Sequence, residues 1–172
     1  LNGEPQHGGE AAIGDIVTVS VPAGTITNDI DIIAPGAPVR IFVPSDDALA
    51  ATWRQSNFDD SSWFAGTTGV GFENATGYQD LIDPAINTHL LTNMFGTRSS
   101  VFSRVTFNYN SSEPIEGLIL RMKYDDGFVA YLNGTEFARS NAAAGTPAFN
   151  AAAMAEHAGG LLQSFSVPVG LL

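Results

Sequence analysis

The sequence contains no cysteine, and this absence excludes a whole group of chemistries. A thiol nucleophile, a zinc–thiolate centre and a disulfide each need a cysteine sulfur. Small secreted domains often depend on disulfides, but a chain of 172 residues can bury a sizeable core without them. Length and composition therefore predict one globular domain, or one domain with an extension.

Positive charge is also scarce. Seven Lys and Arg residues stand against 18 Asp and Glu residues, Lys123 is the only lysine, and the formal net charge is −11. A charge of this sign opposes binding to nucleic acid or to an anionic membrane surface, so we expect neither partner. One interpretation is that the acidic residues only keep the protein soluble. The alternative is that they suit a salty or calcium-containing environment outside the cell. The expected location is extracellular or at the cell surface.

Long hydrophobic runs and catalytic motifs are missing as well. No segment approaches the ~18 consecutive apolar residues of a membrane span, so membrane insertion is not expected. The sequence has no Gly-x-Ser-x-Gly motif, and His7, His89 and His157 do not share the spacing of metal ligands. We therefore predict that the chain is not an enzyme.

Short strand patterns separated by turn residues make up most of the chain. Apolar and polar residues alternate at 15–21, 25–33, 39–43, 101–109 and 164–169, which predicts strands there. A proline followed by apolar residues at helical spacing predicts a short helix over 84–94, and 140–160 is expected to be a long loop. This distribution predicts an all-β, antiparallel β-sandwich over 36–172, with 1–35 as an N-terminal arm or β-extension.

The stretch from Leu118 to Arg139 carries the strongest of these patterns. Two strands are expected to flank a tight turn at Asp125-Asp126-Gly127, and a second turn at Asn133-Gly134 leads into a third strand. Asn-Gly between apolar runs favours a type I′ hairpin turn, because both central residues of that turn have positive φ. We therefore expect an antiparallel meander at the centre of the molecule.

Aromatic residues are concentrated between Trp53 and Trp63. Asp59 or Asp60 can accept hydrogen bonds from backbone N–H groups two and three residues later, in an Asx-turn or a one-turn helix cap. Trp53, Phe58 and Trp63 would then fill part of a sandwich core. The alternative, in which the two tryptophans form a stacking platform for a sugar, stays open.

Acidic doublets occur at Asp46-Asp47, Asp59-Asp60 and Asp125-Asp126. Adjacent residues on a strand point to opposite faces, so a doublet suits a turn or oxygen ligation better than a general acid–base pair. Calcium takes six to eight oxygen ligands from loops, and Asp125 and Asp126 are the candidate ligands. The competing interpretation is that this doublet only builds its turn.

Several of these segments, in this order, resemble one family. They are Phe58-Asp-Asp-Ser-Ser-Trp63, Gly69-Val-Gly-Phe72, Ser103-Arg-Val-Thr-Phe107, the stretch from Tyr124 to Gly134, and Ala138-Arg-Ser-Asn141. They resemble the galactose-binding-like jelly-roll modules of large secreted proteins from planctomycete- and verrucomicrobia-type bacteria, often found beside lamin-tail or spore-coat-kinase-like domains. The sugar-binding domains of family 2 glycosidases and rhamnosidases are similar. The resemblance covers about residues 36–172.

The resemblance implies a non-catalytic jelly roll that binds carbohydrate or serves as an extracellular spacer. A guanidinium at the rim of such a sandwich can hold sugar hydroxyls, although a solvated or ion-paired arginine is the ordinary case. The candidate ligand contacts are Tyr78, Arg121, Asp126 and Arg139. The candidate structural residues are Trp53, Asp59, Asp60, Trp63, Gly127, Asn133 and Gly134.

The resemblance also implies one more strand after 164–169 than this sequence contains. The chain is then expected to be part of a longer protein, or to be completed by a strand from a neighbouring subunit. The alternative function is accordingly a structural or assembly subunit of an extracellular fibre or sheath. Its contacts would run through residues 1–35 and the open sheet edge.

Overall fold

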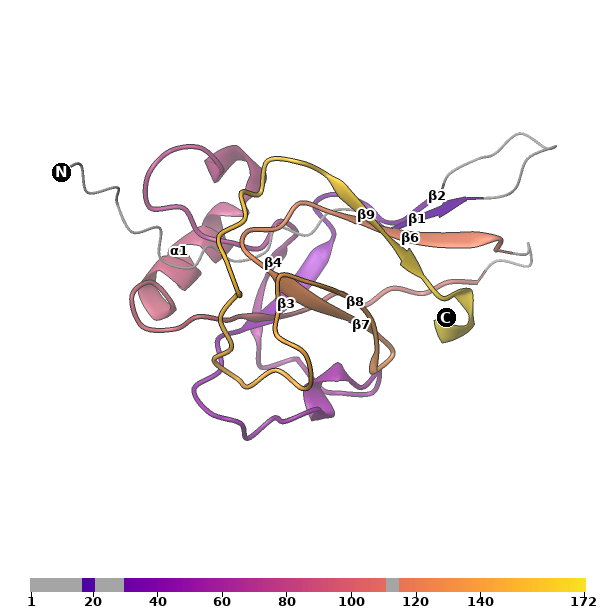
Figure 1. The fold of residues 1–172 in the computed structure, drawn as a ribbon, viewed down its shortest axis with the longest axis horizontal. Coiled ribbons are helices and arrows are strands. Elements are labelled where there is room, and N and C mark those ends of the chain that lie inside the picture. Colours follow the sequence, from indigo (N-terminus) through magenta and orange to yellow (C-terminus); the bar gives the residue numbers. More distant parts are fainter. Residues whose placement is uncertain (1–16, 21–29, 111–114) are drawn as a thin grey trace.

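The fold is rich in strands and has few helices. The computed structural model describes residues 17–20, 30–110 and 115–172. The strands in these ranges form a four-stranded, a three-stranded and a two-stranded sheet, all antiparallel (Figure 1). The expectation of a β-rich, antiparallel fold is confirmed.

The four-stranded sheet combines both ends of the described chain. It contains β1 (Val17–Ser20), β2 (Ile30–Ile33), β6 (Gly117–Met122) and β9 (Gln163–Val167), in the order β2-β1-β6-β9. The N-terminal region that the sequence suggested as an arm or β-extension thus supplies two strands, and β1 pairs directly with β6. Residues 21–29, where the sequence predicts the start of the second strand, lie outside the described residues.

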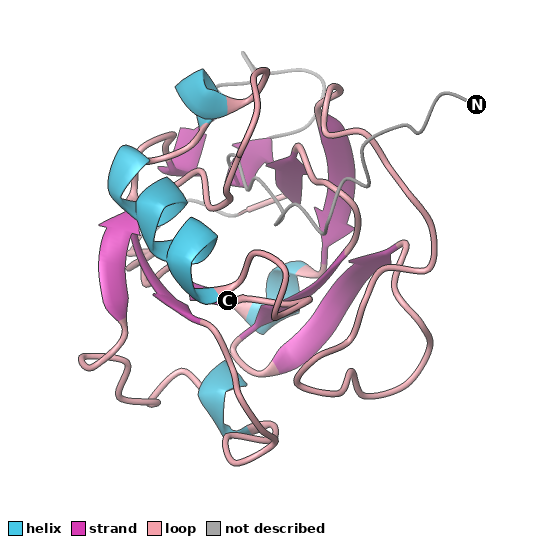
Figure 2. Ribbon diagram, turned by 90° about the vertical axis from the view of Figure 1, so that its left-hand side faces the viewer, coloured by secondary structure: helices cyan, strands magenta, loops and turns pink. Residues whose placement is uncertain are grey.

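The three-stranded sheet carries the main helix. Its strands are β3 (Pro38–Phe42), β4 (Phe64–Thr67) and β5 (Phe102–Arg104), in the order β4-β3-β5, and α1 (Pro84–Asn93) packs beside them (Figure 2). Gly66 permits this close packing, because a Cβ at this position would lie 2.6 Å from the Ile86 side chain. The described part of the chain also contains three short 3₁₀ helices: η1 (Thr52–Arg54), η2 (Gln79–Leu81) and η3 (Val169–Leu171).

The helix predicted over 84–94 is confirmed, and its start has a clear cause. The Asp83 side chain caps it by accepting hydrogen bonds from the N–H groups of Ala85 (2.8 Å) and Ile86 (3.2 Å). Pro84 occupies the first helical position, where its missing N–H costs nothing. Asp83 also accepts bonds from the Thr67 N–H (2.9 Å) and hydroxyl (2.6 Å), so one carboxylate joins the helix to β4.

The hairpin of β7 (Phe128–Leu132) and β8 (Thr135–Ser140) is the two-stranded sheet. Asn133 and Gly134 have φ values of +49° and +86°, which confirms positive φ at both turn positions. The Asn133 side chain also donates a hydrogen bond to the carbonyl of Leu171 (2.7 Å), which ties the turn to η3.

The predicted central meander is wrong. β6 pairs with β1 and β9, whereas β7 pairs with β8, so β6 and β7 lie in different sheets. Asp125-Asp126-Gly127 therefore carries the chain between sheets instead of closing a hairpin. The reason is that a period-two pattern reports a buried face and contains no information about the pairing partner.

The strand predicted over 101–109 is also shorter than expected. β5 ends at Arg104, although residues 105–109 continue to alternate between partly buried and exposed positions. A strand is defined by its ladder, and 105–109 have no ladder partner among the described residues.

Within the described residues, two separate hydrophobic clusters are found in place of a single core. The helix cluster consists of Val39, Ile41, Val70, Phe72, Ile86, Leu90 and Met94. The β6 cluster is built on Leu118 and Val167, with Ile32, Ile115, Leu120, Leu132, Phe137 and Val169 packed against them. One contiguous core is usual for a domain of this size, so the division itself needs an explanation.

Candidate functional site

A cavity of about 1740 Å³ lies between the two hydrophobic clusters. Its wall includes Val39, Val70, Phe72 and Met94 from the helix cluster, and Leu118, Leu120, Leu132, Phe137 and Val167 from the β6 cluster. Protein interiors are normally packed with few voids larger than a water molecule. A cavity of this size, with a wall that is more apolar than polar, is the candidate binding site of the described residues.

Two segments line the cavity edge-on. Every residue from 101 to 109 and every residue from 126 to 133 belongs to its wall. Successive side chains of a strand point to opposite faces, so an unbroken run of lining residues means that the strand presents its backbone edge. These edges belong to the 101–109 segment, which contains β5, and to β7.

Unpartnered polar atoms mark one end of the same wall. Trp53 Nε1, Arg54 Nε and the Tyr131 hydroxyl are buried, and none has a hydrogen-bond partner within the described ranges. The Arg54 guanidinium lies 4.3 Å from the centre of the Tyr131 ring, and Trp53 stacks on Phe102 at 4.3 Å. Burial raises the pKa of Tyr131, and the positive charge of Arg54 opposes that rise.

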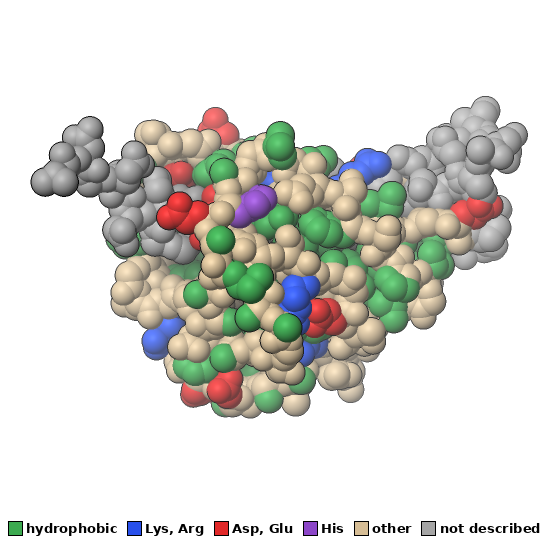
Figure 3. Space-filling view, viewed as in Figure 1, with side chains coloured by type: hydrophobic (Ala, Val, Ile, Leu, Met, Phe, Trp, Pro, Cys, Tyr) green, Lys and Arg blue, Asp and Glu red, His purple; other side chains and the backbone are tan. Residues whose placement is uncertain are grey.

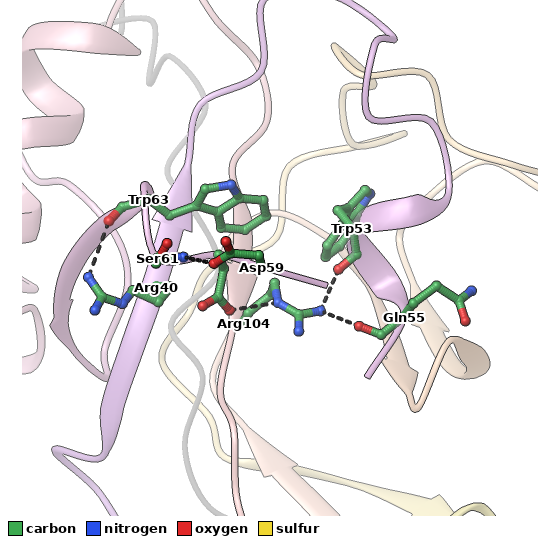
Figure 4. A network of polar contacts seen from close by, with 8 residues as sticks. Arg40, Trp53, Gln55, Asp59, Ser61, Trp63 and Arg104 are labelled. Atoms are coloured by element: carbon green, nitrogen blue, oxygen red, sulfur yellow. Dashed lines mark hydrogen bonds and ion pairs between the residues drawn. The ribbon is translucent and has the colours of Figure 1, made fainter. Parts of the chain in front are cut away.

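The segment between the two tryptophans forms a polar corner around Arg104 (Figure 4). Arg104 Nε donates to Asp60 Oδ2 (2.8 Å), and its guanidinium also donates to the backbone carbonyls of Trp53 and of Gln55, the latter at 3.1 Å. Arg104 thus fixes the loop that carries Trp53 against β5. The sequence placed Arg104 in a predicted strand and in one of the segments that carry the family resemblance, but it did not indicate these contacts.

The expected Asx-turn is present at Asp59. Its carboxylate accepts a hydrogen bond from the Ser61 N–H (3.0 Å), and bonds from the Ser61 hydroxyl and backbone lower the Asp59 pKa. Trp63 is 5 % exposed and stacks on Phe42 at 5.3 Å. The Asp-Asp-Ser-Ser-Trp segment thus contacts the three-stranded sheet through Trp63, which stacks on Phe42, and through Asp60, which pairs with Arg104 of β5.

The two candidate calcium ligands bond to backbone amides of the long loop. Asp125 Oδ2 accepts a hydrogen bond from the Gly159 N–H (3.3 Å), and Asp126 Oδ1 accepts one from the His157 N–H (2.8 Å). Within the described ranges, no group of three His, Cys, Asp or Glu residues could hold a metal ion. Calcium binding stays a prediction.

An aromatic–polar network that was not predicted from the sequence holds the same loop. The His157 ring stacks on Tyr124 at 4.2 Å, and its Nδ1 lies 3.0 Å from the Tyr124 carbonyl oxygen. The Tyr124 hydroxyl lies 2.8 Å from Ser140 Oγ and donates to Gln163 Oε1 (3.3 Å). Its residues come from distant parts of the chain, so no local pattern could reveal the network.

The candidate carbohydrate contacts have diverse surroundings. Arg139 forms a two-pronged ion pair with Glu136 (2.9 Å for both bonds) and donates to the carbonyls of Ala143 and of Gly145, the latter at 2.7 Å. This pairing lowers the pKa of Glu136 and raises that of Arg139. Tyr78 precedes η2, and Arg121 lies on β6 opposite β9. Asp126 and Arg139 thus both hold the loop that follows β8.

Neither the surface of the molecule nor the comparison with known proteins indicates a ligand. Acidic, basic and hydrophobic side chains are interspersed on the face shown in Figure 3. No helix within the described ranges is long and apolar enough to cross a membrane. No family model, no curated protein and no solved structure matches the chain.

Proposed function

We propose that this chain is a non-catalytic, galactose-binding-like β-sandwich module that serves as an assembly part of a larger extracellular structure. In this role it binds a protein partner in the cavity between its two hydrophobic clusters. The observation that carries the proposal is the division of the core by about 1740 Å³ of apolar-walled space. Partner binding would bury this wall and join the clusters, which is a large hydrophobic gain.

Assembly is favoured over carbohydrate binding by the environment of the candidate sugar contacts. Sugars are bound through hydrogen bonds, and Arg139 already directs bonds to a carboxylate and two carbonyls of its own chain. The Asp126 carboxylate accepts from a loop amide in the same way. The cavity wall, in contrast, is largely apolar, which suits protein side chains.

Native mass spectrometry of the protein from its source tests the proposal. We expect a particle heavier than the 18.1 kDa of this chain, in which the cavity residues are protected from carbene footprinting. A strictly monomeric 18.1 kDa species with a fully labelled cavity would overturn the assembly role.

A glycan array separates the two functions. Substituting Ala130, in the cavity wall, by Phe should weaken partner binding and leave any glycan retention unchanged. Retention that is lost in Arg139→Ala or Tyr78→Ala but kept in Ala130→Phe would instead support a carbohydrate-binding module.

A further inference from the structure

We propose that the cavity receives one extended strand of a partner protein, which pairs through its backbone with both cavity edges. The inference rests on the proposed function and specifies the chemistry of the partner. The strand would lie between residues 105–109 and β7, so that a continuous sheet runs from β4 to β8.

Both edges of the cavity can accept a further strand. Within the described ranges, β5 pairs with β3 alone and β7 pairs with β8 alone. Residues 105–109 line the cavity and alternate between partly buried and exposed positions, and they have no ladder partner among the described residues. A partner that covers these edges must offer hydrogen bonds to their backbone N–H and C=O groups. A strand supplies them to two edges at once, whereas a helix uses its own backbone groups internally.

The size of the cavity also fits an inserted strand. A strand rises about 3.3 Å per residue, strands lie about 4.8 Å apart and stacked sheets about 10 Å apart, so each residue of an inserted strand fills roughly 160 Å³. Six residues would fill about 950 Å³ on the same basis. The cavity of about 1740 Å³ holds such a strand together with rearranged side chains, and exceeds the roughly 300–1,000 Å³ of ordinary small-molecule pockets.

The apolar wall of the cavity indicates which side chains the strand carries. Val39 and Phe72 line the cavity from the helix cluster, and Leu118 and Phe137 line it from the β6 cluster. A strand between the two clusters would contact both of them, so we expect a nearly continuous apolar segment. At the end near Trp53, Arg54 and Tyr131, the partner should present a hydrogen-bond acceptor, because two of the three unpartnered atoms there can only donate.

The probe is the peptide acetyl-KVIVAVK-amide, with a matched control in which alternate residues of the same peptide are N-methylated. The control keeps the apolar side chains and removes backbone donors. We expect the unmodified peptide to slow amide hydrogen exchange at least tenfold in 105–109 and 128–132. Exchange in β4, an edge strand that does not line the cavity, should not change.

Trapping and selection complete the test. Because the chain has no cysteine, an Ala130→Cys variant can form a disulfide with a probe that carries one central cysteine. Ala65→Cys, on β4, is the control and should not react faster than a free thiol. In parallel, a library of five-residue segments is fused after Leu172 through a Gly-Ser linker and selected for protease resistance. Apolar, proline-free segments should be enriched.

The outcomes are decisive in each direction. Equal binding of the methylated and unmethylated peptides would overturn strand pairing but leave an apolar partner site, and so the proposed function, in place. A dimer of the chain alone that protects the cavity would replace the strand with a second copy. If the peptide does not bind and no segment is enriched, the inference is overturned. The assembly role is tested separately, by native mass spectrometry of the protein from its source.

Discussion

At the residue scale, single polar side chains join elements that are far apart in sequence. Asp83 caps α1 and bonds to β4, and Arg104 binds Asp60 and the backbone of the loop that carries Trp53. Hydrogen bonds that involve a charged group contribute about 1.5–3 kcal/mol each in favourable settings, and less when exposed. Substituting such a residue should therefore lower the stability of the protein measurably.

Asp83→Ala should lower the free energy of unfolding by about 2 kcal/mol, because it removes a helix cap and the two bonds to Thr67. Urea denaturation measures the change. Asp80→Ala is the matched control: it removes an exposed carboxylate from the neighbouring η2 turn and should stay within about 0.5 kcal/mol of the parent. Equal losses in the two variants would contradict the role of Asp83.

Asp83 should also contribute to acid sensitivity. Its hydrogen bond from the Thr67 hydroxyl, followed by backbone bonds, lowers its pKa below the ordinary 3.8. A group with a depressed pKa in the folded state stabilises the fold above its unfolded pKa, and this contribution is lost as the pH falls through 3.8 towards the folded value. The stability difference between the parent and Asp83→Asn should therefore shrink from pH 6 to pH 3 in urea titrations. A stability difference that stays constant over this pH range would argue against a contribution of Asp83 to acid sensitivity.

At the element scale, the β7–β8 hairpin depends on its turn, since Gly134 has a φ of +86°. Gly134→Ala should cost about 1–2 kcal/mol of stability, because alanine is strained at positive φ. The new Cβ would also lie 3.0 Å from Gln55 Nε2, so Gln55 must move. Thermal denaturation followed by circular dichroism is the measurement.

Gly145→Ala provides the control for that substitution. Gly145 has the same φ of +86°, and a Cβ there meets no atom within 4 Å. Its cost should be the backbone strain alone, about 1 kcal/mol. If Gly145→Ala proves as destabilising as Gly134→Ala, the contact with Gln55 is irrelevant to the turn.

At the scale of the whole molecule, the two hydrophobic clusters should behave as independent units while the cavity is unfilled. Ile86→Val and Leu118→Val each remove one methylene, and each should cost about 1 kcal/mol. Because the cavity separates the two sites, their effects should add within about 0.5 kcal/mol in a double-mutant cycle.

Ile86→Val with Leu90→Val is the matched pair inside one cluster, one turn apart on α1. These residues share neighbours, so a coupling above about 0.5 kcal/mol is expected. Urea denaturation of all the single and double variants gives both coupling energies. Equal coupling energies in the two cycles would show that the clusters are energetically coupled across the cavity.

The sequence by itself determined the features that depend on neighbouring residues. Alternation specified most of the strands, Pro84 and the apolar spacing after it specified α1, and Asn133-Gly134 specified the hairpin turn. The Asx-turn at Asp59 follows from its own side chain reaching a backbone N–H two residues later. Each of these is decided within about ten residues of chain.

Only the tertiary structure decided which strands pair. The expected meander failed because Leu118 and Leu120 are equally suited to pair with β1, β9 or β7, and burial of a face does not choose among them. The alternation beyond Arg104 was read as strand, but a strand needs a neighbour, and residues 105–109 have none among the described residues. The cavity could not be predicted from the sequence, because its wall combines residues of both hydrophobic clusters that lie far apart in the chain.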